Sequence, residues 1–245
     1  MRKVFLFIII TSAVIFSACK KSTEDFTLVS VGEYYPLQIG KYITYNLDST
    51  VFINFGTKDT VISYQVKHEI DALITDNLGR TAYRIIRYIR KTPANAWAAD
   101  NTFMAVASES TIEFIENNMR FIKLKAPVRN GYYWKGNSYI DTYSLNSDVK
   151  YLDDWDYTYD SVNVQLSLGA FTIDSTLKVA QRDEIIGNPS DINSYHEINF
   201  GEEKYAKGLG MIYRNFLHVE YQPPTPGRGG YKQGYGVKLT MIDHN

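Results

Sequence analysis

The chain has 245 residues, of which 44% are hydrophobic and 22% are charged, and its formal net charge at pH 7 is −1. This near-neutral balance argues against a general nucleic-acid binder, which needs a basic surface. The hydrophobic share is enough for a packed core, and the single cysteine rules out an internal disulfide.

Residues 1–18 have the layout of a secretory signal peptide. Arg2 and Lys3 precede an apolar run over residues 4–14 that only Thr11 and Ser12 interrupt, and Ile15, Phe16 and small residues follow it. A basic start, a short apolar core and small residues before the cleavage point define this class of signal. The run is shorter than the about 20 residues of a membrane-spanning helix. We expect residues 1–18 to be removed, which takes away Arg2 and Lys3 and leaves 24 basic against 27 acidic residues.

The end of this segment, FSAC, resembles the bacterial lipobox, in which small residues precede the modified cysteine. Ser17 and Ala18 fit the pattern, whereas Phe16 stands where the lipobox usually has Leu. The resemblance implies cleavage before Cys19 and attachment of fatty acyl chains such as palmitate to that residue. Two or more acyl chains anchor a protein stably to a membrane. The alternative is a plain cleavable signal peptide that leaves a free thiol at Cys19.

Residues 19–30 form a short polar tether between the predicted anchor and the first structural element. Lys20 is not the Asp that resembles an inner-membrane retention signal, so the outer membrane of the cell envelope is favoured. Glu24 and Asp25 weakly resemble surface-export tags of Bacteroidota lipoproteins. The sequence leaves open whether the protein faces the periplasm or the cell surface.

From residue 31 onward the first half of the chain shows the period-two alternation that predicts β-strands. Asn117 and Asn118 predict a tight turn, since Asn tolerates positive φ, and the DNLG segment at 76–79 predicts another. The predicted strands cover residues 42–47, 51–55, 59–75, 80–92, 102–108, 111–117 and 119–127.

In the second half, residues 130–139 read as a loop or bent strand, and residues 144–155 are the least strand-like and could hold a helical turn. A hairpin with Gly169 at its turn is predicted over 157–184, and a long strand over Leu209–Gln222. The Pro- and Gly-rich residues 223–230 predict an exposed loop before a final strand at 235–243. We therefore expect an all-β fold: one antiparallel domain over 31–245, either a curled sheet or half-barrel or a sandwich, with few short helical turns.

Two segments, YYPLQIGKYITYNLDS near residue 34 and YAKGLGMIYRNFLHVEYQ ending at Gln222, resemble recurring features of small lipoproteins of Bacteroidota. In that group a YYPL..G..W.Y opening and an A.G.G.VY.E strand recur, and here Ile43 stands where the Trp often is. GYYWKGN and WDYTYDSVN are similar to the middle of the same group. The resemblance implies an envelope lipoprotein and brings no catalytic residues.

Known catalytic and metal-binding patterns are weak in this sequence. Ser147 and Lys150 have the Ser-x-x-Lys spacing of penicillin-binding enzymes, but residues 190–193 and 90–93 lack the companion motifs, so the match is attributed to chance. The four histidines lack zinc-site spacing, and neither a cofactor nor a metal is expected. Glu109, Glu113 and Glu116 leave a glycosidase-type carboxylate pair open.

The segment YLDDWDYTYD, residues 151–160, is the most suggestive for ligand contact. Asp153, Asp154 and Asp156 supply hard oxygens suited to Ca²⁺. Trp155 and Tyr157 offer flat faces on which a sugar could stack. The competing interpretation is a solvated loop that leads into a Tyr-rich strand.

These features predict a non-enzymatic binding or structural component of the envelope, attached to the membrane through its lipid anchor. An envelope protein, a glycan or a lipid is the expected further partner, and no nucleic acid is expected. The alternatives are a half-barrel carrier of lipids or other hydrophobic ligands, and a glycan-binding protein or glycan hydrolase.

Overall fold

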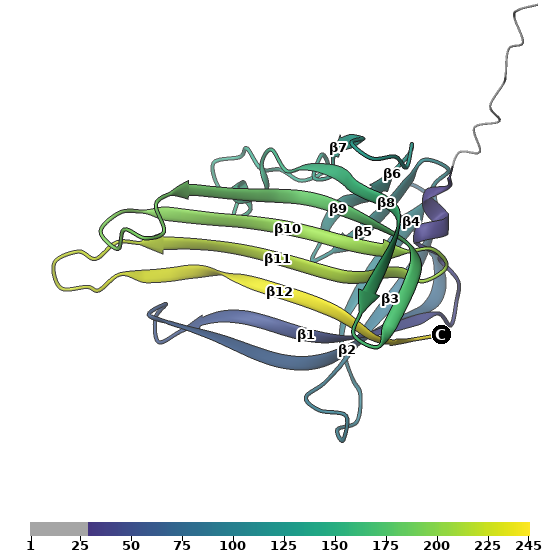
Figure 1. Cartoon of the computed structure of the whole chain (residues 1–245), viewed down its shortest axis with the longest axis horizontal. Helices are drawn as coiled ribbons and strands as arrows, with labels where there is room; N and C mark the ends of the chain where they lie inside the picture. Colours follow the sequence, from purple (N-terminus) through teal and green to yellow (C-terminus); the bar gives the residue numbers. More distant parts are fainter. Residues whose placement is uncertain (1–28) are drawn as a thin grey trace, which may run out of the picture.

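A computed structural model of the chain describes residues 29–245 (Figure 1). The predicted signal peptide and the predicted lipidation of Cys19 lie outside these residues, as does most of the tether. None of the helices in the described part is long and apolar enough to cross a bilayer.

The described chain is an antiparallel β-sheet of twelve strands with two short 3₁₀ helices, η1 (Val31–Tyr34) and η2 (Lys150–Leu152). The strands are β1 (Tyr42–Ile53), β2 (Lys58–Thr75), β3 (Thr81–Arg90), β4 (Ala98–Ala107), β5 (Thr111–Glu116), β6 (Met119–Lys125), β7 (Tyr133–Lys135), β8 (Asp156–Leu168), β9 (Phe171–Gly187), β10 (His196–Ala206), β11 (Gly210–Gln222) and β12 (Tyr231–His244).

The strand order across the sheet is β6-β5-β4-β3-β2-β1-β12-β11-β10-β9-β8-β7. Neighbouring strands are therefore neighbours in sequence except at the β1–β12 pair, where Leu47 lies opposite Leu239. The sheet curls until its two edges approach each other, which makes a nearly closed barrel (Figure 1). The prediction of a single antiparallel all-β domain with few helical turns is confirmed, and its curled-sheet form is the one adopted.

The seam between the two edges is held mainly by side chains. The Ile122 N–H donates to the Gly136 carbonyl at 2.8 Å. The indole N–H of Trp134 donates to the Ile122 carbonyl at 2.7 Å. The Tyr159 hydroxyl accepts from the Lys125 N–H and donates to the Lys125 carbonyl, at 3.0 and 2.9 Å. Hydrogen bonds from Trp134 and Tyr159 side chains therefore take the place of most main-chain hydrogen bonds at this junction.

Tyrosines are used inside the barrel more than the sequence suggested. A high tyrosine count predicts a sheet with one wet face, yet several of these rings are fully buried and their hydroxyls bond to interior groups of the same or another strand. The Tyr45 hydroxyl donates to the Met211 carbonyl at 2.7 Å, and that of Tyr205 donates to Glu203 at 2.5 Å. Such bonds satisfy the polar end of a side chain whose ring fills the core.

The helix η1 closes one end of the barrel. Ser30 caps it by accepting a hydrogen bond from the Gly32 N–H, and Glu33 completes the capping box. Val31 and Tyr34 are fully buried, and the ring of Tyr35 packs against Phe114 and Tyr205. In Figure 1 this end lies opposite the long hairpin that joins β11 to β12.

Two details differ from the sequence-based prediction. Phe55, expected on a strand, lies in the β1–β2 turn with a φ of 57° and a side chain that is 97% exposed. Strand β10 was not predicted at all. Its buried positions include Asn199, Gly201 and Glu203, so the face that turns inward is largely polar. An apolar-in, polar-out pattern therefore does not mark this strand.

Candidate functional site

The interior of the barrel contains a layer of charged residues from strands far apart in sequence. Lys123 on β6 donates to Glu203 on β10 at 2.6 Å. Arg214 on β11 donates to Glu116 on β5 at 3.0 Å. A distance of 3.7 Å between Arg214 Nε and Glu203 connects the two pairs. Two cations and two anions therefore balance each other across the barrel, as buried charges require.

Burial and pairing set the charge states of this layer. Burial alone would raise the pKa of Glu116, but Arg214 and Lys123 outweigh it and lower the pKa to about 2. Burial would likewise lower the pKa of Arg214, but Glu116 and Glu203 raise it above its ordinary value. Both partners of this pair are ionised at neutral pH. A general acid would instead need a raised carboxyl pKa.

His68 lies beside this layer on β2, between the rings of Tyr45 and Phe103, at centroid distances of 5.1 and 5.3 Å. Burial lowers the pKa of His68 to about 3, and the nearby Arg87 adds to the effect. The imidazole is therefore neutral at physiological pH.

A cavity of about 240 Å³ borders the charged layer. Its polar lining includes His68, Arg87, Glu116, Lys123, Gln181 and Arg214. Its apolar lining includes Leu47, Phe103, Phe121, Phe216, Val237 and Leu239. The exposed lining residues Asn117 and Tyr235 lie at its opening. An apolar cavity with a few convergent polar groups is the usual form of a small-molecule site.

Three residues of this lining carry buried nitrogen atoms without a hydrogen-bond partner: His68 Nε2, Gln181 Nε2 and Arg214 Nε. Gln181 lies where the β9–β10 register shifts, opposite the step between Gly201 and Glu202. A bulge of this kind redirects a side chain relative to its neighbours. These nitrogens are fully enclosed by protein atoms, so they belong to the wall and do not face the open space of the cavity. The mixed charged and apolar lining is what marks the cavity as a candidate binding site.

The five residues of the predicted ligand-contact segment line two hollows, and Trp155 lines both of them. Trp155 and Tyr157 are each 2% exposed and line the interior cavity. Asp153, Asp154 and Asp156 line a second hollow, and Trp155 lines it with them. The Trp155 side chain therefore borders both the interior cavity and the hollow of the aspartates, whereas Tyr157 borders the interior cavity. Contact of this segment with a glycan or calcium stays a prediction.

No group of three histidine, cysteine or acidic side chains in residues 29–245 is arranged to hold a metal ion. The Asp153 carboxylate instead accepts a hydrogen bond from Thr142 at 3.0 Å. His218 stacks on Tyr151 of η2 with a centroid distance of 3.7 Å, and His196 stacks on Tyr221 at 4.8 Å. These two histidines pack against aromatic rings.

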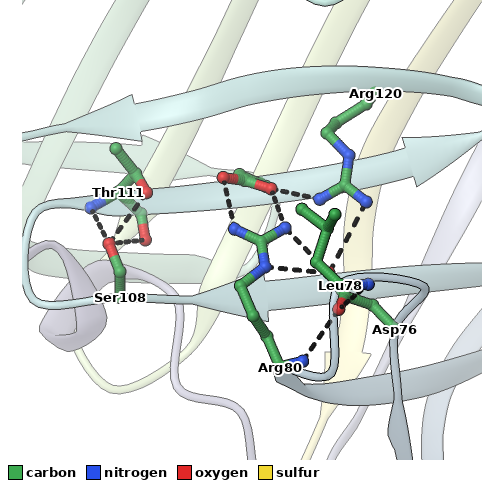
Figure 2. A network of polar contacts seen from close by, with 7 residues as sticks. Asp76, Leu78, Arg80, Ser108, Thr111 and Arg120 are labelled. Carbon is green, nitrogen blue, oxygen red and sulfur yellow. Dashed lines mark hydrogen bonds and ion pairs between the residues drawn. The ribbon is translucent and has the colours of Figure 1, made fainter.

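The acidic residues considered for a glycosidase pair are held apart. Glu113 accepts hydrogen bonds from the two terminal guanidinium nitrogens of Arg80, at 3.1 and 2.9 Å, and also pairs with Arg120. Figure 2 shows this network, in which Asp76 anchors Arg80 from the β2–β3 turn. Glu116 pairs with Arg214 inside the barrel, whereas Glu113 belongs to this separate network, and Glu109 is exposed. Arg80 and Arg120 lower the pKa of Glu113 against the opposing effect of burial.

The Ser-x-x-Lys match also has a local explanation. The Ser147 hydroxyl donates to the Asp141 carbonyl at 2.8 Å, and the Lys150 ammonium donates to the Leu145 carbonyl at 2.8 Å. Both side chains stabilise the loop that carries them.

Sequence reasoning missed most of the interior site. Lys123 was placed on a strand but not assigned a role, and Glu203 and Arg214 were not singled out. One signal was present: Lys123 interrupts the apolar run of β6 at a position that is 4% exposed. A charged residue within an apolar strand indicates a buried partner, but the sequence does not say which residue that partner is.

No protein-family model and no curated protein matches this sequence. Among solved structures, the chain is similar to a protein of Bacteroides fragilis described as a "putative exported protein with YmcC-like fold". The two share 10% sequence identity with a TM-score of 0.38, and the match covers 86% of this chain and 99% of that one. A similarity at this level assigns no function.

Proposed function

We propose that this protein is a lipid-anchored component of the outer membrane that binds a small ligand inside its barrel without catalysing a reaction. The observation that carries the proposal is the interior cavity of about 240 Å³, whose lining combines charged and apolar side chains. A cavity with apolar walls and a few convergent polar groups is the usual form of a small-molecule site.

The membrane attachment rests on the sequence. Residues 1–18 have the signal-peptide layout, and Cys19 is the only cysteine of the chain. The Cys19→Ser variant should lose metabolic labelling with a palmitate analogue and should leave the membrane fraction. A variant that remains labelled would contradict acylation at Cys19.

The size of the cavity favours a small ligand over a membrane lipid. Pockets for drug-sized ligands are typically about 300–1,000 Å³, and this cavity has about 240 Å³. Large side chains fill the rest of the interior, including the fully buried rings of Tyr45 and Tyr205. A diacyl lipid is larger than a drug-sized molecule, so we favour a compact ligand over the lipid-carrier alternative.

Binding is favoured over catalysis by the state of the cavity's carboxylate. Arg214 and Lys123 hold the pKa of Glu116 at about 2, against the effect of burial. A general acid works near the operating pH, whereas Glu116 is ionised throughout that range. The charged layer is suited to fixing the orientation of a ligand.

The proposal is tested with toluene, a small neutral probe, added to the purified protein with ¹³C-labelled methyl groups. We expect shifts of the Leu47, Val237 and Leu239 methyl signals. The Val237→Phe variant, which fills the cavity, should abolish them. Lys238→Phe, a change at the exposed neighbouring position, should retain them. Equal responses in both variants would contradict binding in the interior.

A further inference from the structure

The charged side chains that line the interior cavity are each paired with a partner of opposite charge. The pairs are Arg87–Asp100 at 2.5 Å, Lys123–Glu203 at 2.6 Å and Glu116–Arg214 at 3.0 Å. His68 adds no charge at neutral pH, because burial lowers its pKa to about 3. These pairs hold three cations and three anions, so the cavity offers neither sign of charge in excess.

This balance disfavours a charged ligand. An ion that enters a low-dielectric interior loses its hydration, which is costly unless the ion finds a counter-charge. Glu116 already accepts a hydrogen bond from Arg214, so a carboxylate ligand would have to displace Glu116 from Arg214. An ammonium group would have to displace Arg214 from Glu116 in the same way. An uncharged ligand leaves the pairs in place and keeps their energy.

The walls of the cavity favour an aromatic body. Phe103, Phe121 and Phe216 line it together with Trp155 and Tyr157. Aromatic rings pack favourably on one another in offset or edge-to-face arrangements. An apolar cavity of about 150 Å³ is enough to hold benzene. The cavity of about 240 Å³ therefore has room for one ring with a short substituent.

We infer that the cavity takes an uncharged aromatic molecule of one ring with a short substituent, and that the paired charges of its lining exclude ions of the same size. This inference rests on the proposed interior binding and adds the class of ligand. The ring packs against the aromatic wall, and each ion pair stays intact when the ligand is bound.

The test follows the methyl signals of Leu47, Val237 and Leu239 with three probes of nearly the same size and shape. These probes are neutral benzamide, the anion benzoate and the cation benzamidinium, at pH 7. We expect benzamide to bind at least about tenfold more tightly than either ion, because only the ions give up the hydration of a full charge. Toluene is the apolar reference for interior binding.

The Glu116→Gln variant tests the role of the pairing. It removes one anion and keeps an oxygen that can accept from Arg214, so the lining gains a net positive charge. The affinity for benzoate relative to benzamide should rise at least about tenfold, and that for benzamidinium should fall. Glu109→Gln, at an exposed position away from the cavity, removes the same charge from the protein and should leave the relative affinities unchanged.

The outcomes separate the two proposals. Binding of benzoate or benzamidinium as tight as that of benzamide would overturn the class of ligand, while interior binding stands. Relative affinities that Glu116→Gln leaves unchanged would also overturn it, because the pairing would then not be what excludes ions. If Glu116→Gln does not fold, the wild-type comparison decides the inference. If neither toluene nor benzamide shifts the methyl signals, interior binding fails and the class of ligand fails with it.

Discussion

Replacing His68 by Phe should make the protein less sensitive to acid. In the folded chain burial lowers the pKa of His68 to about 3 from its ordinary 6.5. Between these two values the unfolded chain binds a proton at this residue and the folded chain does not. Acidification therefore favours unfolding, and stability falls as the pH drops from about 6.5 toward 3.

The magnitude follows from the size of the shift. Each pKa unit corresponds to about 1.36 kcal/mol, so one and a half units of acidification, from pH 6.5 to 5, cost about 2 kcal/mol at this residue. Phenylalanine keeps an aromatic ring at this position between Tyr45 and Phe103. It also removes the unpaired Nε2 atom. The variant should therefore retain its fold and lose this part of the pH dependence.

The assay is urea unfolding of both proteins at pH 7 and pH 5. The loss of unfolding free energy between the two pH values should be about 2 kcal/mol smaller in His68→Phe than in the wild type. Ile70→Val, a buried change on the same strand, lowers stability without removing a titrating group and should keep the wild-type dependence. Equal pH dependence in His68→Phe and the wild type, or a His68 NMR titration near pH 6.5, would refute the reasoning.

Three further predictions use the same unfolding assay. Lys123→Met should lower the free energy of unfolding by about 3–5 kcal/mol, because it leaves Glu203 buried without its cation. Adding Glu203→Gln to this variant should recover most of the lost stability. If the double variant recovers none, the ion pair is not the cause of the loss. Gly234→Ala should lower the free energy of unfolding by at least about 2 kcal/mol. The new Cβ would lie 2.1 Å from the His218 carbonyl oxygen, and the backbone φ of +113° is one that alanine rarely adopts. An unchanged free energy of unfolding would contradict this backbone geometry. Asp76→Ala should lower the free energy of unfolding, because it removes the carboxylate that accepts from the Arg80 side chain and from the main-chain N–H groups of Leu78 and Arg80; unchanged stability would place that network outside the folding energetics.

Much of the fold could be predicted from local patterns. Alternation placed β2 and β3 correctly, with Ile62, Tyr64, Val66 and His68 on one face, because each strand has one apolar side. The paired positive φ values of Asn117 and Asn118, 51° and 62°, agree with the predicted tight turn. These strands and this turn could be predicted because their own residues determine their backbone conformation.

The interior site could not be predicted in the same way, because its pairs join distant parts of the chain. Lys123 and Glu203 are 80 residues apart, and Glu116 and Arg214 are 98 apart. Trp155 is predicted to offer a flat face to a ligand, and the local sequence does not show that its side chain is only 2% exposed in the fold. Contacts of this kind depend on the closure of the whole sheet.

At the seam the barrel is closed by side chains, where other neighbouring strands are joined by main-chain ladders. Separating two ordinary strands of this sheet breaks a row of main-chain hydrogen bonds, whereas at the seam Trp134 and Tyr159 supply most of the hydrogen bonds. Closure of the barrel therefore depends on the identity of two residues, and a substitution at either one would loosen this junction in a way that a surface substitution on a paired strand would not.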